Sequence, residues 1–173
     1  MAYETNHLDE SSPELIKTKA IIKEAHDKIR DLSHTLIPPV LEKLGLLSAL
    51  QDLCEKNSNT LIQFEFTNHI AKDSRYNSEF EMKMYFIVAE LLNNIIKHSQ
   101  ASKAFISVEQ NNKQLFINVE DNGTGFDTKK TEHKEGFGLT QIKARIRSMK
   151  GSITINSKPN TGTLIYIKVE LPD

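Results

Sequence analysis

Three short polar segments follow one another in this sequence: ELLNNIIKH at residues 90–98, DNGTG at 121–125 and GFGL at 136–139. The first lies in a run with helical spacing of apolar residues, and the second comes directly after an alternating, strand-like run. The third stands at the start of another helical pattern. A polar helix face, the end of a strand and a glycine-rich helix start are thus expected in this order.

The length and composition limit the classes of protein to which this chain can belong. Its 173 residues suit one globular domain plus an appendage. With 22 Lys and Arg against 23 Asp and Glu, the net charge of −1 gives no electrostatic reason to expect a nucleic-acid partner. Cys54 is alone, which excludes an intrachain disulfide and fits a reducing compartment. No apolar run approaches the ~20 residues that span a bilayer, so we expect a soluble chain.

The first third of the chain has helical periodicity. Ser12-Pro13 is a typical helix start, with a capping Ser and a Pro at the first helical position. Pro38-Pro39 must end that helix, because Pro lacks an N–H donor and restricts the residue before it. A second helix is predicted from Val40 to Glu55. Its expected apolar stripe is Leu41, Leu44, Ala49, Leu50 and Leu53.

After residue 60 the pattern changes to a mixture of strands and helices. The predicted strands are 61–67, 104–109, 114–120, 152–156 and 163–169, and the predicted helices are 78–97, capped by Asn77 or Ser78, and 139–150, ended by Gly151. This order predicts an α+β fold, a two-layer sandwich whose mixed, mostly antiparallel sheet carries helices on one face. A long helical segment precedes it, and we place the boundary near residues 56–60.

The helical segment 90–98 offers a carboxylate and an amide on one face. Glu90 and Asn94 are four residues apart, and Lys97 and His98 follow one turn later. An amide oxygen is a suitable neutral ligand for Mg²⁺, and a carboxylate one turn away can accept a proton or hold a water. Lys97 would neutralise phosphate charge. A solvated polar helix face explains the same residues without any ligand.

The two glycine segments allow a similar pair of interpretations. Asp121 would accept a hydrogen bond from an exocyclic amine, while the glycines let the backbone approach a flat ring. The segment 136–139 would present helix N–H groups to a phosphate. The ordinary alternatives are a β-turn at Asp121 and a hinge at Gly136. The charged stretch 127–135 is either a lid or a solvated loop.

In combination, the three segments indicate a nucleotide pocket without either common phosphate loop. The sequence contains no G-x-x-x-x-G-K-[ST], and no G-x-G-x-x-G follows a first strand. The set resembles the N box and the two glycine boxes of the ATP-binding domain of sensor histidine kinases. That fold is shared with type II topoisomerases, mismatch-repair ATPases and a chaperone family. Thr161-Gly162-Thr163 resembles the last box, and the resemblance covers residues 60–172.

The resemblance implies a role for each matching residue, with ATP and Mg²⁺ as cofactors. Glu90 would be the catalytic base, Asn94 the Mg²⁺ ligand and Lys97 a phosphate contact. Asp121 would bind the adenine amine. The other implied nucleotide contacts are Gly123 and Gly125 at the base, Gly136 and Gly138 at the lid hinge and phosphates, and His98, Phe126, Leu139 and Thr163.

The front of the chain resembles the second dimerisation helix of the nitrate-sensor-like kinases and its junction, through IRDLSHTL at 29–36, Pro38-Pro39 and Leu44-Gly45-Leu46. We therefore expect a disordered terminus at 1–12, a dimerisation and junction helix at 13–56 and the ATP-binding domain at 57–173. His26-Asp27 resembles the acceptor pair of that subfamily but lies only 12 residues before Pro38, on what aligns as the second helix. His34 is expected to pack near the junction. The acceptor helix is expected to be absent from this chain.

The function implied is the catalytic portion of a cytoplasmic sensor histidine kinase. It would transfer the γ-phosphate of ATP to a His outside this chain, for relay to the receiver domain of a response regulator. The intact protein would be a homodimer, with any membrane contact made through regions absent here. The alternatives are a serine kinase of the anti-sigma-factor type, which shares the pocket, and a non-catalytic nucleotide-binding dimerisation module.

Overall fold

The computed structural model describes residues 17, 37–71, 74–128 and 137–172. Contacts divide the chain into two compact units, Met1–Ile37 and Pro38–Asp173, and the second contains the sheet and the helices described below. The predictions for the terminus at 1–12, for the helix before Pro38, for His26 and His34, and for Gly136 lie outside the described residues. Within them, no helix is both long and apolar enough to cross a membrane.

The described residues form a five-stranded sheet in the order β1-β2-β3-β5-β4. Its parallel pair is β1 with β2, and the other neighbours are antiparallel. The mixed, mostly antiparallel sheet is therefore confirmed. The strands are β1 (Gln63–Asn68), β2 (Lys103–Asn111), β3 (Gln114–Asp121), β4 (Ser152–Ser157) and β5 (Thr163–Glu170).

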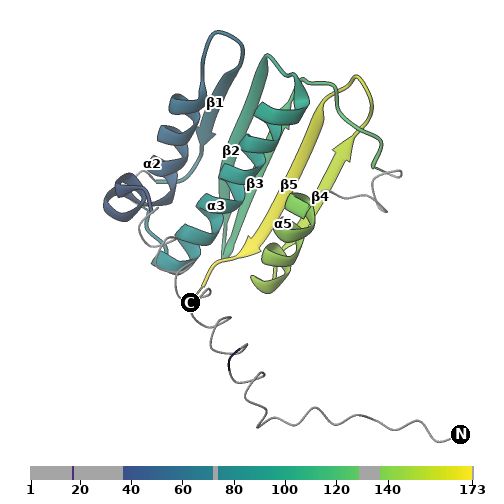
Figure 1. Ribbon diagram of the computed structural model, residues 1–173. Helices are drawn as coiled ribbons and strands as arrows, with labels where there is room; N and C mark the ends of the chain where they lie inside the picture. Colours follow the sequence, from purple (N-terminus) through teal and green to yellow (C-terminus); the bar gives the residue numbers. More distant parts are fainter. Residues whose placement is uncertain (1–16, 18–36, 72–73, 129–136, 173) are drawn as a thin grey trace, which may run out of the picture. The chain divides into compact units, whose positions relative to one another are not determined.

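The helices lie on one face of this sheet, as predicted (Figure 1). They are α2 (Pro39–Asn57), α3 (Ser78–Asn94) with a π-helical turn η1 (Ile95–Ser99), and α5 (Phe137–Ser148). Asn77 caps α3 by accepting a hydrogen bond from the Glu79 backbone N–H at 2.9 Å. The α5 helix ends two residues before the predicted Lys150, because Lys150 adopts a left-handed φ of 54° and Gly151 N–H then bonds back to Ile146 O.

Strand alternation places Asp121 inside the molecule. Residues 115, 117 and 119 of β3 are fully buried against the helices, and the period of two puts Asp121 on the same face at the end of the strand. Its cross-strand neighbours are Ala104 on β2 and Thr163 on β5. The one carboxylate of β3 that faces the helix layer is therefore held between two strands.

Helix α2 differs from the uninterrupted helix that the sequence predicts. Gly45 has a left-handed φ of 80°, which breaks α2 after its first turns. The helix phase changes at the break, so Leu46 and Leu47 are buried while Leu44 is 60% exposed. The predicted place of Leu44 in the apolar stripe is wrong for this reason. Because α2 packs on α3 and β1, it shares a core with the sheet, and the expected division at residue 57 stays a prediction.

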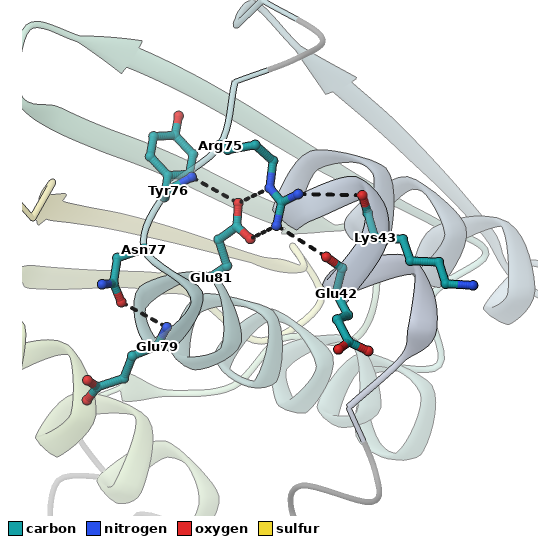
Figure 2. A network of polar contacts seen from close by, with 7 residues as sticks. All are labelled: Glu42, Lys43, Arg75, Tyr76, Asn77, Glu79 and Glu81. Carbon is teal, nitrogen blue, oxygen red and sulfur yellow. Dashed lines mark hydrogen bonds and ion pairs between the residues drawn. The ribbon is translucent and has the colours of Figure 1, made fainter.

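An ion pair and its hydrogen bonds connect the interrupted part of α2 with the start of α3 (Figure 2). Arg75 Nε and Nη2 each donate to one oxygen of Glu81 at 3.1 Å, and Nη2 also reaches the carbonyl of Glu42 at 3.3 Å. That carbonyl belongs to the helical turn before Gly45, so Arg75 contacts both the break in α2 and the start of α3. Glu81 is buried, and its oxygen also accepts the Tyr76 backbone N–H. A Cβ at Gly45 would also lie 2.6 Å from the Arg75 side chain. The left-handed φ and this close contact therefore both favour glycine at this position.

Candidate functional site

The three polar segments of the sequence meet at one pocket of about 420 Å³. The end of α3 and the turn η1 form one wall, the ends of β3 and β5 form the floor, and the start of α5 closes a third side. The predicted site residues that line it are Glu90, Asn94, Lys97, His98, Asp121, Gly125, Phe126, Gly138, Leu139 and Thr163. Segments far apart in the sequence thus converge on one cavity.

Glu90 and Asn94 face the start of α5. A Cβ placed on Gly138 would lie 2.9 Å from Glu90 Oε1 and 3.9 Å from both polar atoms of the Asn94 amide. The Asn94 Nδ2 atom is buried and has no hydrogen-bond partner among the residues that the structure describes. A buried donor without a partner costs about 1–3 kcal/mol, so this amide calls for an acceptor supplied by a ligand. Gly138 leaves the space for one.

The π-helical turn sets the position of the two basic residues of the pocket. Each π turn contains an extra residue compared with an α turn, so it changes which side chains share a face. Here Lys97 and His98 both line the pocket although they are adjacent in the sequence and exposed to solvent. The predicted α-helix to residue 97 missed this turn. The pocket consequently has Lys97 and His98 at its exposed side, on the turn that follows α3.

Asp121 forms the opposite, buried end of the pocket. Only 6% of its surface is exposed, and burial raises its pKa above the usual range for a carboxyl. Hydrogen bonds from Gly123 N–H, at 2.8 Å, and from the Thr163 hydroxyl act in the other direction, because they favour the ionised form. Two protein donors leave further acceptor positions on the carboxylate, which has about four.

The loop after Asp121 packs too closely for side chains. A Cβ on Gly123 would lie 2.3 Å from the Ser99 carbonyl, and one on Gly125, whose φ is 56°, would lie 2.2 Å from the Lys158 carbonyl. Thr124 N–H bonds to Ser99 O at 2.7 Å, which ties the loop to η1. Gly123 does not line the pocket; it holds Asp121 through its N–H instead. The expected contact of Gly123 with the base stays a prediction.

Several pocket residues were not predicted from the sequence. They are Leu91, Asn93, Ile95, Ser99, Thr124 and Ile165. The alternation of β5 offers a signal for Ile165, which lies two residues after Thr163 and so shares its face. Leu91, Ile95 and Ser99 are spaced by four residues, a pattern that a helix places in one row. The apolar members of that row were assigned to the core alone.

The donor set suits a metal ion that arrives with phosphates. No cluster of three or more His, Cys, Asp or Glu side chains suited to a metal is present among the described residues. Mg²⁺ is commonly held by one or two protein oxygens together with substrate phosphates and waters. Asn94 and Glu90, which line the pocket together with Gly138, fit this kind of site.

Comparison with known proteins agrees with this geometry. Residues 80–173 match the family described as histidine kinase-, DNA gyrase B- and HSP90-like ATPases. The chain is 31% identical over 173 residues to the signal transduction histidine-protein kinase/phosphatase DegS of Brevibacillus brevis, covering 98% of this chain and 44% of that protein. It is 29% identical to the oxygen sensor histidine kinase NreB of Staphylococcus carnosus, covering 91% and 45%. The chain spans less than half the length of these relatives.

Solved structures share the fold. The catalytic domain of histidine kinase ThkA aligns with a TM-score of 0.58 at 18% identity, covering 73% of this chain and 90% of that one. The histidine kinase domain of the E. coli osmosensor EnvZ aligns with a TM-score of 0.56 at 14% identity, covering 74% and 87%. The chain belongs to the histidine kinase-, DNA gyrase B- and HSP90-like ATPase family, and it contains the catalytic domain of a sensor histidine kinase of the DegS and NreB type.

Proposed function

We propose that the pocket binds ATP with Mg²⁺ and that the intact protein transfers the γ-phosphate to a histidine outside the described residues. The main observation behind this proposal is that the two ends of the pocket have opposite hydrogen-bonding needs. Buried Asp121 offers acceptor positions at one end. At the other end, next to the α5 start, Asn94 Nδ2 has no acceptor within the described part of the chain. A molecule with an exocyclic amine at one end and phosphate oxygens at the other satisfies both.

Each residue then has a chemical task. Asp121 accepts the hydrogen bond of the adenine amine, and Asn94 donates to a phosphate oxygen while its own oxygen is the atom suited to Mg²⁺. The α5 start, with Gly138 and Leu139, presents backbone N–H groups to the phosphates. Lys97 adds positive charge at the exposed side of the pocket. When bound, the metal ion would neutralise charge on the phosphates.

Glu90 is the proposed general base. Its carboxylate lies beside Gly138 and so at the phosphate end of the pocket. There it would accept a proton from the attacking imidazole, directly or through a water. Phosphoryl transfer needs little covalent help from the protein, so positioning and charge neutralisation would supply most of the rate. The remaining pocket residues therefore act by holding the nucleotide.

The proposal extends to the partners of the intact protein. The phosphorylated histidine would pass its phosphoryl group to the receiver domain of a response regulator, and the kinase would work as a cytoplasmic homodimer. Support comes from the relatives named above, which are described as sensor histidine kinases. Net charge gives no support for a nucleic-acid partner.

The test is to incubate the intact protein that contains this chain with γ-labelled ATP and Mg²⁺. We expect label on a histidine, recognised because it is lost in acid and kept in base. Asn94→Ala and Glu90→Ala should each abolish it, whereas Gln51→Ala, an exposed change on α2, should not. Acid-stable label on a serine of a partner protein would support the serine kinase instead. Nucleotide binding without any transfer would support a non-catalytic module.

A further inference from the structure

The hydroxyl of Ser157 stands at the centre of a hydrogen-bond chain beside the pocket. Ser157 ends β4 and is the cross-strand neighbour of Thr163. Its Oγ lies 2.9 Å from the Phe126 backbone nitrogen, 3.0 Å from the Gly162 carbonyl oxygen and 3.0 Å from Thr163 Oγ1. No sequence pattern singled out Ser157, and Ser157 does not itself line the nucleotide pocket.

The direction of each hydrogen bond follows from the groups involved. The Phe126 N–H can only donate, so Ser157 Oγ accepts from it. An ionised Asp121 can only accept, so the Thr163 hydroxyl that bonds to it gives Asp121 its single proton. Thr163 Oγ1 is then an acceptor on its Ser157 side. The one proton of Ser157 is shared between Thr163 Oγ1 and the Gly162 carbonyl.

These hydrogen bonds through Ser157 join two segments of the pocket that are far apart in the sequence. Phe126 and Thr163 both line the pocket, and Ser157 is hydrogen-bonded to each of them. A further hydrogen bond between this loop and the β4–β5 turn runs from Asn160 N–H to Thr124 O. Loss of the Ser157 hydroxyl would leave the Phe126 N–H without its partner and free the Thr163 hydroxyl to rotate.

We propose that Ser157 is a positioning residue for the adenine end of the pocket: it holds the Thr163 hydroxyl on Asp121 and fixes Phe126 at the pocket wall. This inference rests on the proposed function. It predicts that Ser157 affects base recognition while making no contact with the nucleotide. The Asp121 carboxylate, which these hydrogen bonds orient, is the group that would accept a hydrogen bond from the exocyclic amine of adenine. Guanine carries a carbonyl at the ring position of that amine.

The test compares Ser157→Ala with Thr161→Val. Both changes remove a hydroxyl at or next to the β4–β5 turn. Within the described residues, however, the Thr161 hydroxyl bonds to the Lys158 carbonyl alone, and Thr161 does not line the nucleotide pocket. We expect Ser157→Ala to weaken binding of a non-hydrolysable ATP analogue about tenfold, the size of one lost hydrogen bond, and to lower the preference over the GTP analogue. Thr161→Val should bind as the unchanged protein does, and Ser157→Thr should restore most of the affinity.

A second measurement separates this inference from the function on which it rests. Carbon-detected NMR of the ligand-free chain reports the pKa of Asp121 directly. Loss of the Thr163 hydrogen bond removes a contribution that lowers this pKa, so Ser157→Ala should raise it while Thr161→Val leaves it unchanged. If the unchanged protein binds no nucleotide, the proposed function is wrong. The NMR result then still tests whether Ser157 holds the Thr163 hydroxyl on Asp121. An unaltered affinity and an unaltered pKa in Ser157→Ala would overturn the inference.

Discussion

Replacing Arg75 with alanine tests how the break in α2 is held against α3. The change leaves Glu81, whose side chain is only 2% exposed, without its cation. Removing one partner of a buried ion pair costs about 3–5 kcal/mol. Arg75 itself is 44% exposed, so water enters the vacated space and solvates part of the carboxylate. The Tyr76 N–H also remains as a donor. We therefore expect Arg75→Ala to lose about 2–3 kcal/mol of unfolding free energy.

Two further variants identify the cause of that loss. Lys83→Ala breaks an ion pair with Glu79 on the same helix, where both side chains are exposed, and should leave the stability almost unchanged. If the cost of Arg75→Ala comes from a stranded buried charge, adding Glu81→Gln to it should recover part of the loss, because the carboxylate is then removed. Urea unfolding followed by circular dichroism measures all four proteins. A midpoint for Arg75→Ala that matches Lys83→Ala would refute the reasoning.

Three other changes follow from the same structure. Gly45→Ala should lose about 2–4 kcal/mol in urea unfolding, since alanine at a φ of 80° is strained and its Cβ meets Arg75 at 2.6 Å; a loss below 0.5 kcal/mol would contradict this. The raised pKa of Asp121 means that the folded state favours the protonated carboxyl. The protonated carboxyl therefore stabilises the fold at acid pH, and this contribution to stability is lost as pH rises through the folded pKa. The ligand-free Asp121→Asn protein should therefore gain in melting temperature relative to the unchanged protein between pH 4 and 8, and a relative loss over that range would count against it. Burial raises the pKa of Cys54 to about 12, so at pH 8 a thiol reagent should label it only as fast as the chain unfolds, and rapid labelling of native protein would contradict its burial.

The sequence predicted the order of elements because each has a strong local signal. The alternation of 115, 117 and 119 is unambiguous, and it carries Asp121 to the covered face without any further information. Residue type alone likewise narrowed the cap to Asn77 or Ser78, and the structure shows that it is Asn77. The pairing of Glu90 with Asn94 follows from helical spacing, and the structure adds that both face Gly138.

What the sequence did not reveal depends on contacts between distant segments. Gly45 reads as an ordinary glycine in a helix, and its left-handed φ makes sense only beside Arg75, thirty residues further along the chain. The π-helical turn at Ile95–Ser99 has no local signature here, so the sequence predicted Lys97 and His98 at the pocket but placed them on a continuous α-helix. Ser157 was missed for the same reason, since its partners Phe126 and Thr163 meet only in the folded sheet.

The most direct test of the central claim is calorimetric titration of this chain with a non-hydrolysable ATP analogue, with and without Mg²⁺. We expect saturable binding that Mg²⁺ strengthens, and a loss of at least tenfold in Asp121→Asn, because the amide presents a donor where the carboxylate accepts. The same titration of Thr161→Val should match the unchanged chain. Absence of binding in the unchanged chain, with or without Mg²⁺, would contradict the account.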